Sequence, residues 1–397
     1  MRGPRGAGPG AEVAGFVDDF RAFVAGTLAD APAPGPETVY DDEHPLWEKF
    51  RAAGLANWWL PARHGGPGVP LRVSVDLIAE LSYHDPGFAF AAMLPILGSR
   101  MLEFYGTAEV ADRYLGEMAK GGTFCAALGS EVVAGSELAL TATTFRREGD
   151  HLVVDGEKAF STNLAFGRFC LALARNAEDH RDFSVVLVPA DTPGFEPGPR
   201  WLMSGLHGTG TYPATFTNCV VPAANELSGN GLRVLEVGLN GSRILMAAIA
   251  IGIARRARDL SMEYAGNKQL GGRPLTQNAV FAARMGQLEM ELESLKSVCW
   301  RAADEYDALY AREDAAAAFH GQGVLKSAVM AKMHCGQTGW RIVSAVSEGF
   351  GGLGYTEAHP VQRLLRDMRH ISLVEGGDDV LRELTYGRYV RHASRRG

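Results

Sequence analysis

The stretch EGFGGLGY, residues 348–355, has glycines at the spacing of a dinucleotide-binding fingerprint. That fingerprint, G-x-G-x-x-G, needs a strand before the glycines and a helix that opens at them. Here the preceding residues, 336–348, place their apolar side chains at helical spacing, and Pro360 interrupts an immediate helix afterwards. The sequence therefore argues against a Rossmann βαβ unit at this point. The sequence leaves open that the three glycines, Gly349, Gly351 and Gly354, approach a dinucleotide by another route.

A glutamate at the end of an apolar run is the second feature that could do chemistry. Glu375 follows HISLV and precedes Gly376-Gly377, so it lies at the edge of a segment that we predict to be buried. Burial raises the pKa of a carboxyl group above its free value of about 4.3, toward the range of a general base. Position alone favours the simpler alternative, a surface glutamate at a helix start, where negative charge is stabilised.

The composition is that of a globular protein able to bury a large core. The 397 residues are 46% apolar and 21% charged, and this length predicts two or three domain-sized units. A net charge of −7 argues against broad nucleic-acid binding. The five cysteines are scattered without a C-x-x-C pair, which favours reduced thiols over disulfides or a metal site. We found no apolar run of roughly 18 residues and no signal-like start, and we therefore predict a cytoplasmic protein without a membrane span.

The secondary structure that the sequence pattern predicts changes twice along the chain. Helical periodicity dominates the first 120 residues, short β-prone runs alternate with turns from Thr123 to about Pro222, and longer helical segments follow Gly229. The run REGDHLVVDGEK predicts a hairpin and then a second turn, and the helical pattern over residues 280–310 predicts a long bundle helix. Such segregation is typical of α+β proteins. We predict domains at 1–121, 122–228 and 229–397.

Five motifs in one order resemble the acyl-CoA dehydrogenase family, and the resemblance covers nearly the whole chain. It implies an N-terminal helical domain, a central β-barrel-like domain and a C-terminal four-helix bundle. The motifs are CAALGSEVVAGSE (125–137), GEKAFSTN (156–163), ADTPGFEPG with SGLHGTGTYPATFTNCVVPAAN (190–198 and 204–225), EGFGGLGYT (348–356) and RLLRDMRHISLVEGG (363–377).

The family reaction implies roles for the residues around Glu375. It removes two hydrogens from the α and β carbons of an acyl thioester: a carboxylate takes the α proton and FAD takes the β hydride. The resemblance makes Glu375 the base and its backbone N–H a donor to the thioester oxygen. It places Arg243 beside Glu375 and makes Arg243 and Gly376 substrate contacts. Without the resemblance, Arg243 could equally be a surface arginine at a helix terminus. Some family members carry the glutamate at the position that is Ser242 here, so that alternative base is missing.

The resemblance assigns FAD contacts in separate parts of the chain. Leu128, Gly129 and Ser130 would face the pyrimidine edge of the flavin, and Gly135 and Ser136 its phosphate or the pantetheine arm of the substrate. Phe160 would cover the ring, beside Ser161, and Thr162 would donate toward N5, although strand packing is the simpler interpretation of Phe160 and Thr162. The remaining implied contacts are Lys268, Glu348, Gly351, Gly352, Gly377 and Asp379, with the glycine pair serving an FAD held mainly by the neighbouring subunit.

Several of these positions depart from the family pattern. Lys268 and Gly271 replace an arginine and a phenylalanine, Glu348 replaces a glutamine, and Gly377 replaces a threonine. A carboxylate near phosphates repels them unless it is neutralised. Val132 also replaces a proline in the loop after residue 131. The departures weaken the adenosine pocket more than the catalytic one.

The sequence therefore predicts FAD-dependent dehydrogenation of an acyl thioester carried by coenzyme A or by an acyl carrier protein. The predicted partners are an electron-accepting flavoprotein or oxygen and further copies of the chain, as a homodimer or homotetramer. Two alternatives stay open. One is a flavin-dependent monooxygenase on the same fold, which should lack a base at Glu375. The other is a non-catalytic acyl-thioester or partner-binding protein that has lost FAD.

Overall fold

The computed structural model describes residues 9–391, and its N-terminal part is a layer of helices around an aromatic core. Phe20, Phe50 and Trp58 are buried and meet edge to face, with ring centroids 5.6–6.3 Å apart. Asp85 caps one helix by accepting a hydrogen bond from the Phe88 N–H at 3.0 Å. The helices are α1 (Pro9–Phe23), α2 (Pro45–Ala52), α3 (Leu71–His84), α4 (Pro86–Met93), α5 (Pro95–Tyr105) and α6 (Ala108–Gly121).

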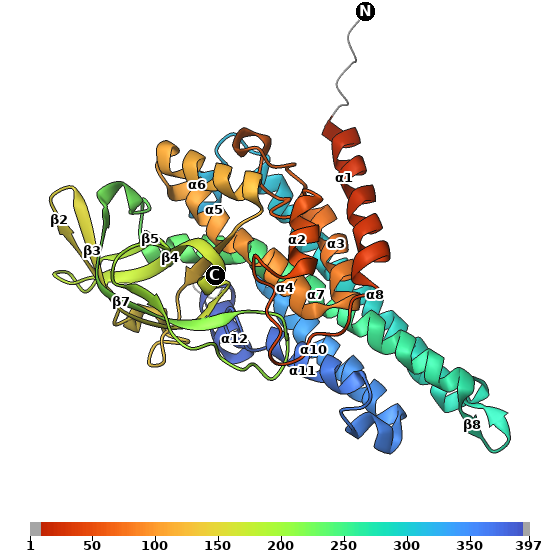
Figure 1. Cartoon of the computed structure of the whole chain (residues 1–397). Helices are drawn as coiled ribbons and strands as arrows, with labels where there is room; N and C mark the ends of the chain where they lie inside the picture. Colours follow the sequence, from red (N-terminus) through yellow and green to blue (C-terminus); the bar gives the residue numbers. More distant parts are fainter. Residues whose placement is uncertain (1–8, 392–397) are drawn as a thin grey trace, which may run out of the picture.

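The middle of the chain forms one curled sheet around its own apolar core (Figure 1). Its strand order is β1-β4-β2-β3-β7-β6, and β5 pairs with β4 off this path. The pairs β1–β4 and β2–β4 are parallel, and the other pairs are antiparallel. The strands are β1 (Phe124–Leu128), β2 (Thr144–Glu148), β3 (His151–Thr162), β4 (Gly167–Asn176), β5 (Phe183–Pro189), β6 (Phe195–Pro197) and β7 (Thr211–Pro222).

The predicted hairpin is confirmed, but the second predicted turn is wrong. Strands β2 and β3 pair antiparallel and are joined at Gly149 and Asp150. At Gly156 the chain does not turn: β3 continues to Thr162 with a shift of register against β7. Gly156 has a φ of +139°, and a Cβ there would lie 2.6 Å from the Cα of Thr143. The glycine thus serves a β-bulge rather than a turn.

The C-terminal part is a bundle of long helices, as predicted (Figure 1). The four main helices are α7 (Gly231–Asn267), α8 (Ala279–Tyr310), α10 (Lys326–Gly349) and α11 (Val361–Ile371). A two-stranded hairpin, β8 (Gln269–Leu270) with β9 (Arg273–Pro274), joins α7 to α8. The shorter helices are α9 (Ala315–Gln322) and α12 (Asp378–Thr385), and a single 3₁₀ segment, Gly351–Tyr355, follows α10. The α+β class with the order helical, sheet, helical is confirmed. The division into domains at residues 121/122 and 228/229 stays a prediction.

Two helical segments are long and apolar enough to cross a membrane by length and composition, contrary to our expectation from the sequence. They are Pro86–Tyr105, with a mean hydropathy of 1.2, and Gly231–Asn267, with 1.6. However, 83% and 100% of their most apolar windows are buried inside the protein. Core helices show the same combination, so this finding is weak support for a membrane span.

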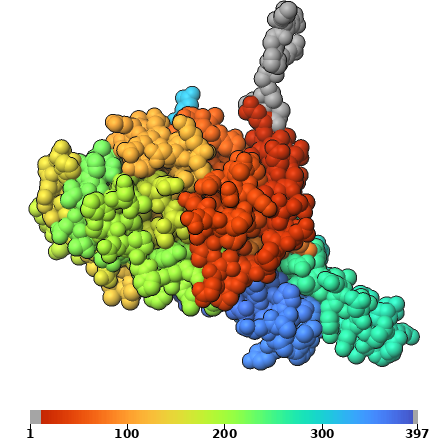
Figure 2. Space-filling view, viewed as in Figure 1, coloured from red at the N-terminus to blue at the C-terminus, as the bar shows by residue number. Residues whose placement is uncertain are grey.

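The α7–α8 connection extends away from the rest of the chain. Figure 2 shows this teal end projecting from the body, with the blue C-terminal segments beside its base. The sheet and the N-terminal helices lie side by side on the opposite part of the molecule (Figures 1 and 2). The two ends of α7 therefore belong to different regions of the surface.

Candidate active site

Glu375 lies in the short loop between α11 and α12 and has an unusual backbone conformation. Its φ is +54°, in the left-handed region that a residue with a side chain rarely adopts. Such a conformation costs on the order of 1–3 kcal/mol and persists only where the surroundings fix it. Among residues 9–391, no hydrogen bond has the Glu375 N–H as its donor. The conformation therefore presents, beside a carboxylate, a backbone donor that has no partner in the described range of the chain.

Two buried cations hold this loop by its carbonyl oxygens. Arg243, from the middle of α7, donates from Nε and Nη2 to the Glu375 oxygen at 3.0 and 2.8 Å. Lys332, from α10, donates to the Gly376 oxygen at 2.6 Å. Arg243 is 4% exposed, which rules out the alternative of a surface arginine at a helix terminus. Consecutive peptide groups are thus fixed from two different helices.

The Glu375 carboxyl group is buried, although part of the residue reaches the surface. Burial raises its pKa, and Ser242 and the charges of Arg243 and Lys332 oppose that rise. The Ser242 hydroxyl donates to Oε1, whereas Oε2 is buried and has no partner among residues 9–391. One carboxylate oxygen is therefore held and the other is free to accept a proton. The environment of this carboxylate is therefore that of a buried group with a raised pKa, rather than that of a surface glutamate.

The first two sequence motifs meet at one end of the sheet through a buried ion pair. Lys158 Nζ lies 2.8 Å from Glu131 Oε1 and 3.1 Å from the Gly129 oxygen, and both side chains of the pair are at most 5% exposed. Burial would raise the pKa of Glu131, but hydrogen bonds from Lys158, Thr141 and the Ala142 N–H outweigh it and hold that pKa at about 2. The Ser130 oxygen also accepts from the Ala159 N–H at 3.0 Å. These contacts fix the backbone of residues 129–131.

Beside this loop, β3 presents an exposed aromatic surface and a buried hydroxyl. Phe160 is 56% exposed and lies against Trp201, which is 42% exposed, with ring centroids 5.5 Å apart. Trp201 also donates from Nε1 to the Ala159 oxygen at 2.8 Å. Thr162 shares a hydrogen bond with Thr211 at 2.9 Å, and the buried Ser161 hydroxyl has no partner among the residues that the structure describes. Phe160 and Trp201 thus form an exposed aromatic surface, whereas the hydroxyl of Ser161, the next residue along the strand, is in the interior.

The sheet end and the Glu375 loop are both anchored to α4. Asn163, directly after β3, donates to the Ala91 oxygen at 3.0 Å. Phe90 contacts the His370 ring with centroids 4.8 Å apart, and His370 lies on α11 a few residues before Glu375. The loop after β1 also packs on α7, because a Cβ on Gly129 would lie 3.2 Å from Leu235. The structure thus brings the flavin-loop motifs and the candidate base to one region.

Other predicted contacts lie at the far end of the bundle. Lys268 follows α7 and is exposed, and Gly271, with a φ of +61°, lies in the β8–β9 turn. Gly351 and Gly352 follow α10 and are exposed, and Gly351 has a φ of +60°. The structure therefore separates this group, along the length of α7, from Arg243.

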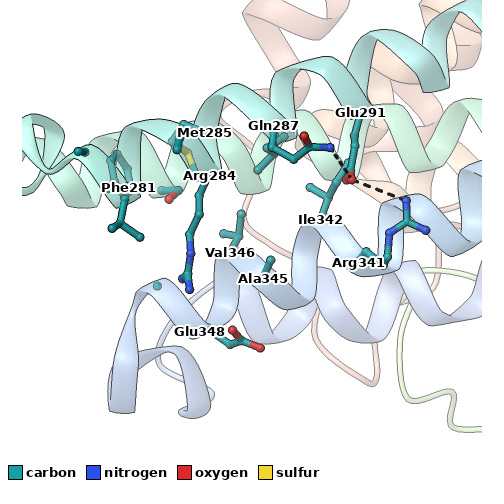
Figure 3. Close-up of a pocket in the computed structure, with 16 residues that line it drawn as sticks. Phe281, Arg284, Met285, Gln287, Glu291, Arg341, Ile342, Ala345, Val346 and Glu348 are labelled. Atoms are coloured by element: carbon teal, nitrogen blue, oxygen red, sulfur yellow. Dashed lines mark hydrogen bonds and ion pairs between the residues drawn. The ribbon is translucent and has the colours of Figure 1, made fainter.

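A cavity of about 740 Å³ between α8 and α10 reaches Glu348 (Figure 3). Its walls are mostly apolar, and Arg284 extends from α8 toward the end of α10 that carries Glu348 (Figure 3). On the other side of the cavity, Arg341 lies 3.7 Å from Glu291. Arg284 is a cation that the sequence analysis did not single out, and it lines the same cavity as Glu348.

Four of the predicted contacts make few contacts in this chain. Gly135 and Ser136 are exposed, in the loop whose Val132 and Val133 are 86% and 76% exposed. Gly377 precedes α12 with a φ of −59°. Asp379 is exposed and pairs with Arg382 on the same helix. Their predicted roles toward FAD stay predictions.

Sequence reasoning missed three residues around Glu375 and Phe160. Lys332 could have been found, because it lies on the otherwise apolar or small-residue face of α10, where a lysine is unexpected. Ser242 was noted only as a missing glutamate. Trp201 lies in a loop and becomes a neighbour of Phe160 because its N–H donates to the Thr211 oxygen at 2.9 Å on β7, the strand that pairs with β3.

Comparisons with known proteins agree with this arrangement. Three models of the acyl-CoA dehydrogenase family match the chain: the N-terminal domain over residues 11–122, the middle domain over 126–219 and the C-terminal domain over 229–389. A probable acyl-CoA dehydrogenase, YngJ of Bacillus subtilis, is 28% identical over 365 residues, covering 88% of this chain and 91% of the relative.

Solved structures of the same fold cover nearly the whole chain. Butyryl-CoA dehydrogenase from Megasphaera elsdenii has a TM-score of 0.84 at 23% identity, covering 98% of this chain and 99% of that one. The prolyl acyl carrier protein oxidase AnaB has a TM-score of 0.84 at 21% identity and covers 95% and 98%. A glutaryl-CoA dehydrogenase from Mycobacterium smegmatis in complex with FADH2 has a TM-score of 0.81 at 20% identity and covers 96% and 95%.

These matches confirm the fold and the enzyme class that the sequence predicts, a flavoprotein oxidoreductase acting on CH–CH bonds. Because the matched models run from residue 11 to residue 389 and their order follows the observed order of helices, sheet and helices, this chain belongs to the acyl-CoA dehydrogenase family.

Proposed function

We propose that this protein catalyses the FAD-dependent α,β-dehydrogenation of an acyl thioester to the 2-enoyl thioester. The observation that carries the proposal is the state of Glu375. One oxygen of its buried carboxylate is held by Ser242, and the other oxygen and the backbone N–H have no partner within the described part of the chain. An α C–H is a very weak acid, so its removal needs both a base and a donor to the enolate oxygen. Glu375 supplies one of each.

The chain's own residues have distinct tasks in this proposal. Glu375 Oε2 takes the α proton, and the Glu375 N–H donates to the thioester oxygen as negative charge develops there. Arg243 and Lys332 hold the two carbonyls that follow, so this N–H needs no reorganisation during the reaction. FAD, when bound, supplies the hydride acceptor. Phe160 and Trp201 offer the aromatic surface for its ring, and Leu128, Gly129 and Ser130 the backbone beside it.

The proposal includes two alternative carriers of the acyl group and two alternative electron acceptors. Coenzyme A and an acyl carrier protein both present the thioester on a pantetheine arm, and the similar structures include an enzyme of each kind. An electron-transferring flavoprotein or oxygen would reoxidise the flavin. A cytoplasmic location and the absence of nucleic-acid and membrane partners are likewise proposals. A product panel with acyl-CoA and acyl-carrier substrates, read by intact mass, distinguishes the carriers.

We also propose that the chain assembles as a homodimer or homotetramer. The far end of the bundle exposes several large apolar side chains, a pattern that marks an interaction surface. They are Met262 (43%), Leu270 (58%), Val280 (64%), Met290 (71%), Leu353 (44%) and Tyr355 (89%). The predicted adenosine contacts lie in the same part of the molecule: Lys268, Glu348, Gly351 and Gly352. A second chain that covered this part would bury the apolar side chains and complete the adenosine site.

The test of the proposed function is Glu375→Gln, which keeps the shape of the side chain but removes its basicity. General-base contributions are about 10²–10⁴-fold, and a weak carbon acid should require the upper end. We expect the purified wild-type protein to be yellow and the variant to retain FAD, to bind an acyl thioester and to reduce the flavin at least 100-fold more slowly. Anaerobic stopped-flow mixing at saturating substrate separates chemistry from binding.

Two outcomes would overturn the proposal. A variant that reduces its flavin within threefold of wild type would show that the proton goes to another group, which would favour the monooxygenase alternative. A colourless wild-type protein that takes up no FAD on titration would favour a binding protein without redox activity.

A further inference from the structure

Lys332 is a buried lysine that the proposed reaction does not itself use. Its side chain is fully buried on the face of α10 that is otherwise formed by small and apolar residues. Its Nζ donates to the Gly376 oxygen at 2.6 Å and lies 3.9 Å from Asp378 Oδ1. A charge at such a position is unfavourable unless it is paired and hydrogen-bonded. The hydrogen bond and the ion pair of Lys332 reach the loop that carries Glu375 and the first residue of α12.

The hydrogen bond to Gly376 fixes the part of this loop with the greatest conformational freedom. Gly376 has a φ of +96° and, without a Cβ, could adopt many other conformations. Arg243 donates hydrogen bonds to the preceding carbonyl, that of Glu375, whereas the Gly376 carbonyl accepts from Lys332. With both carbonyls held, the peptide planes on the two sides of Gly376 are set, and Glu375 is kept at its φ of +54°.

We propose that Lys332 is a positioning residue for the catalytic base. It anchors the Gly376 carbonyl from α10 and thereby holds the Glu375 carboxylate and N–H in the orientation that proton removal requires. This inference rests on the proposed function of Glu375, because it concerns how that residue is held. Lys332 itself touches neither the reacting atoms nor, in this role, the substrate.

The charge of Lys332 adds a second effect on the same group. Burial lowers the Lys332 pKa to about 8, with Asp378 and Glu375 raising it and Arg243 lowering it further. The groups facing it are therefore Arg243 from α7, Glu375 from the loop and Asp378 from α12, while Lys332 in turn lowers the pKa of His370 on α11. A cation favours the ionised form of a nearby carboxyl. Removing the charge should thus move the Glu375 pKa upward.

Two substitutions separate the anchor from the charge. Lys332→Gln keeps a hydrogen-bond donor for the Gly376 oxygen but removes the charge, and Lys332→Met removes both. Lys296→Met, which removes a 36% exposed lysine on α8, is the matched control for loss of one positive charge. Flavin reduction is followed anaerobically at saturating thioester across pH. An infrared titration of the protonated carboxyl band, assigned by its loss in Glu375→Gln, reads the Glu375 pKa without catalysis.

If Lys332 positions the base, Lys332→Met lowers the limiting reduction rate by up to about 100-fold, the loss typical of a small misplacement, without raising the KM in proportion. Lys332→Gln recovers most of the limiting reduction rate. Both variants move the acid limb of the pH profile, and the Glu375 pKa read by infrared titration, to higher pH. Lys296→Met changes neither. Plateau rates within threefold of wild type in both Lys332 variants, with an unmoved infrared pKa, would overturn the inference.

Failure of both variants to fold, judged by thermal unfolding, would overturn it too, because Lys332 would then be needed for stability rather than for orientation. The outcome stays separable from the proposed function. If the wild-type protein oxidises no thioester, the proposed function fails, while the infrared titration still reports whether Lys332 acts on Glu375.

Discussion

Ser242→Ala tests whether the environment of Glu375 sets the pH range of the reaction. The Ser242 hydroxyl donates the hydrogen bond that Glu375 Oε1 accepts, and Oε2 has no partner, so the substitution leaves a buried carboxylate without a side-chain donor. Ser242 is itself fully buried, which makes the removal of one oxygen a small change in packing.

The size of the effect follows from that single contact. A hydrogen bond to a charged group contributes about 1.5–3 kcal/mol, and 1.4 kcal/mol corresponds to a factor of ten. The sign is fixed as well: burial already raises the Glu375 pKa and Ser242 opposes the rise, so the pKa moves upward in the variant. At a pH on the acid limb, the ionised fraction and the rate should fall about 10- to 100-fold. On the alkaline plateau the rate should stay within about threefold of wild type, because the base is still present.

The assay is anaerobic flavin reduction at saturating thioester, measured over a pH range that includes both the acid limb and the alkaline plateau of the wild-type profile. Ser184→Ala is the matched control, because the Ser184 hydroxyl is also buried but has no partner. Superimposable pH profiles for wild type and Ser242→Ala would refute the reasoning. A plateau that falls as far as the acid limb would instead assign Ser242 to the orientation of Glu375.

Two further predictions concern stability and assembly. Lys158→Met removes the cationic partner of the buried Glu131 carboxylate and should lower the free energy of unfolding, measured in urea, by about 3–5 kcal/mol. The control Arg181→Met, at a 94% exposed side chain, should change that free energy by less than about 0.5 kcal/mol. A loss below about 1 kcal/mol for Lys158→Met would contradict the role of the pair. Because the Glu131 pKa is held at about 2, below its ordinary 4.5, the contribution of this carboxylate is complete above pH 4.5 and is lost as the pH falls toward 2. Burial lowers the pKa of Lys158 to about 8, so the pair also loses its positive charge as the pH rises through that value. Flavin loss and subunit dissociation should be linked, so a flavin-loaded monomer in sedimentation at micromolar concentration would contradict the proposed assembly.

The order of elements was predictable from the sequence because each region keeps one hydrophobic period. The helical repeat over residues 280–310 became α8, and the alternation in REGDHLVV became β2 and β3. Gly156 was the exception: a glycine after an aspartate is typical of a turn, but here close packing against Thr143 produces a bulge within β3. A local pattern does not carry this distinction, because the contact that decides it comes from another strand.

The candidate site was predictable in its residue types but not in what holds them. Glu375 stood out because an apolar run leads into it. Its left-handed conformation and the cations on two carbonyls depend on α7 and α10 meeting at the loop, and residues 243 and 332 lie far from 375 in the sequence. The Lys158–Glu131 pair likewise joins two motifs that the sequence presents separately.

The length of α7 has a consequence for how this chain can vary. Arg243 lies within the helix, and Lys268, which directly follows the last helical residue, is 25 positions after Arg243. At 1.5 Å per residue, the helix therefore sets these two residues about 37 Å apart. Such a spacer cannot absorb insertions as a loop does: each added residue would rotate everything beyond it by about 100° and shift it by about 1.5 Å. Insertions in α7 would therefore leave the Glu375 loop unchanged while turning the β8–β9 hairpin away from whatever it contacts. Natural length variation should concentrate in the connections rather than within this helix.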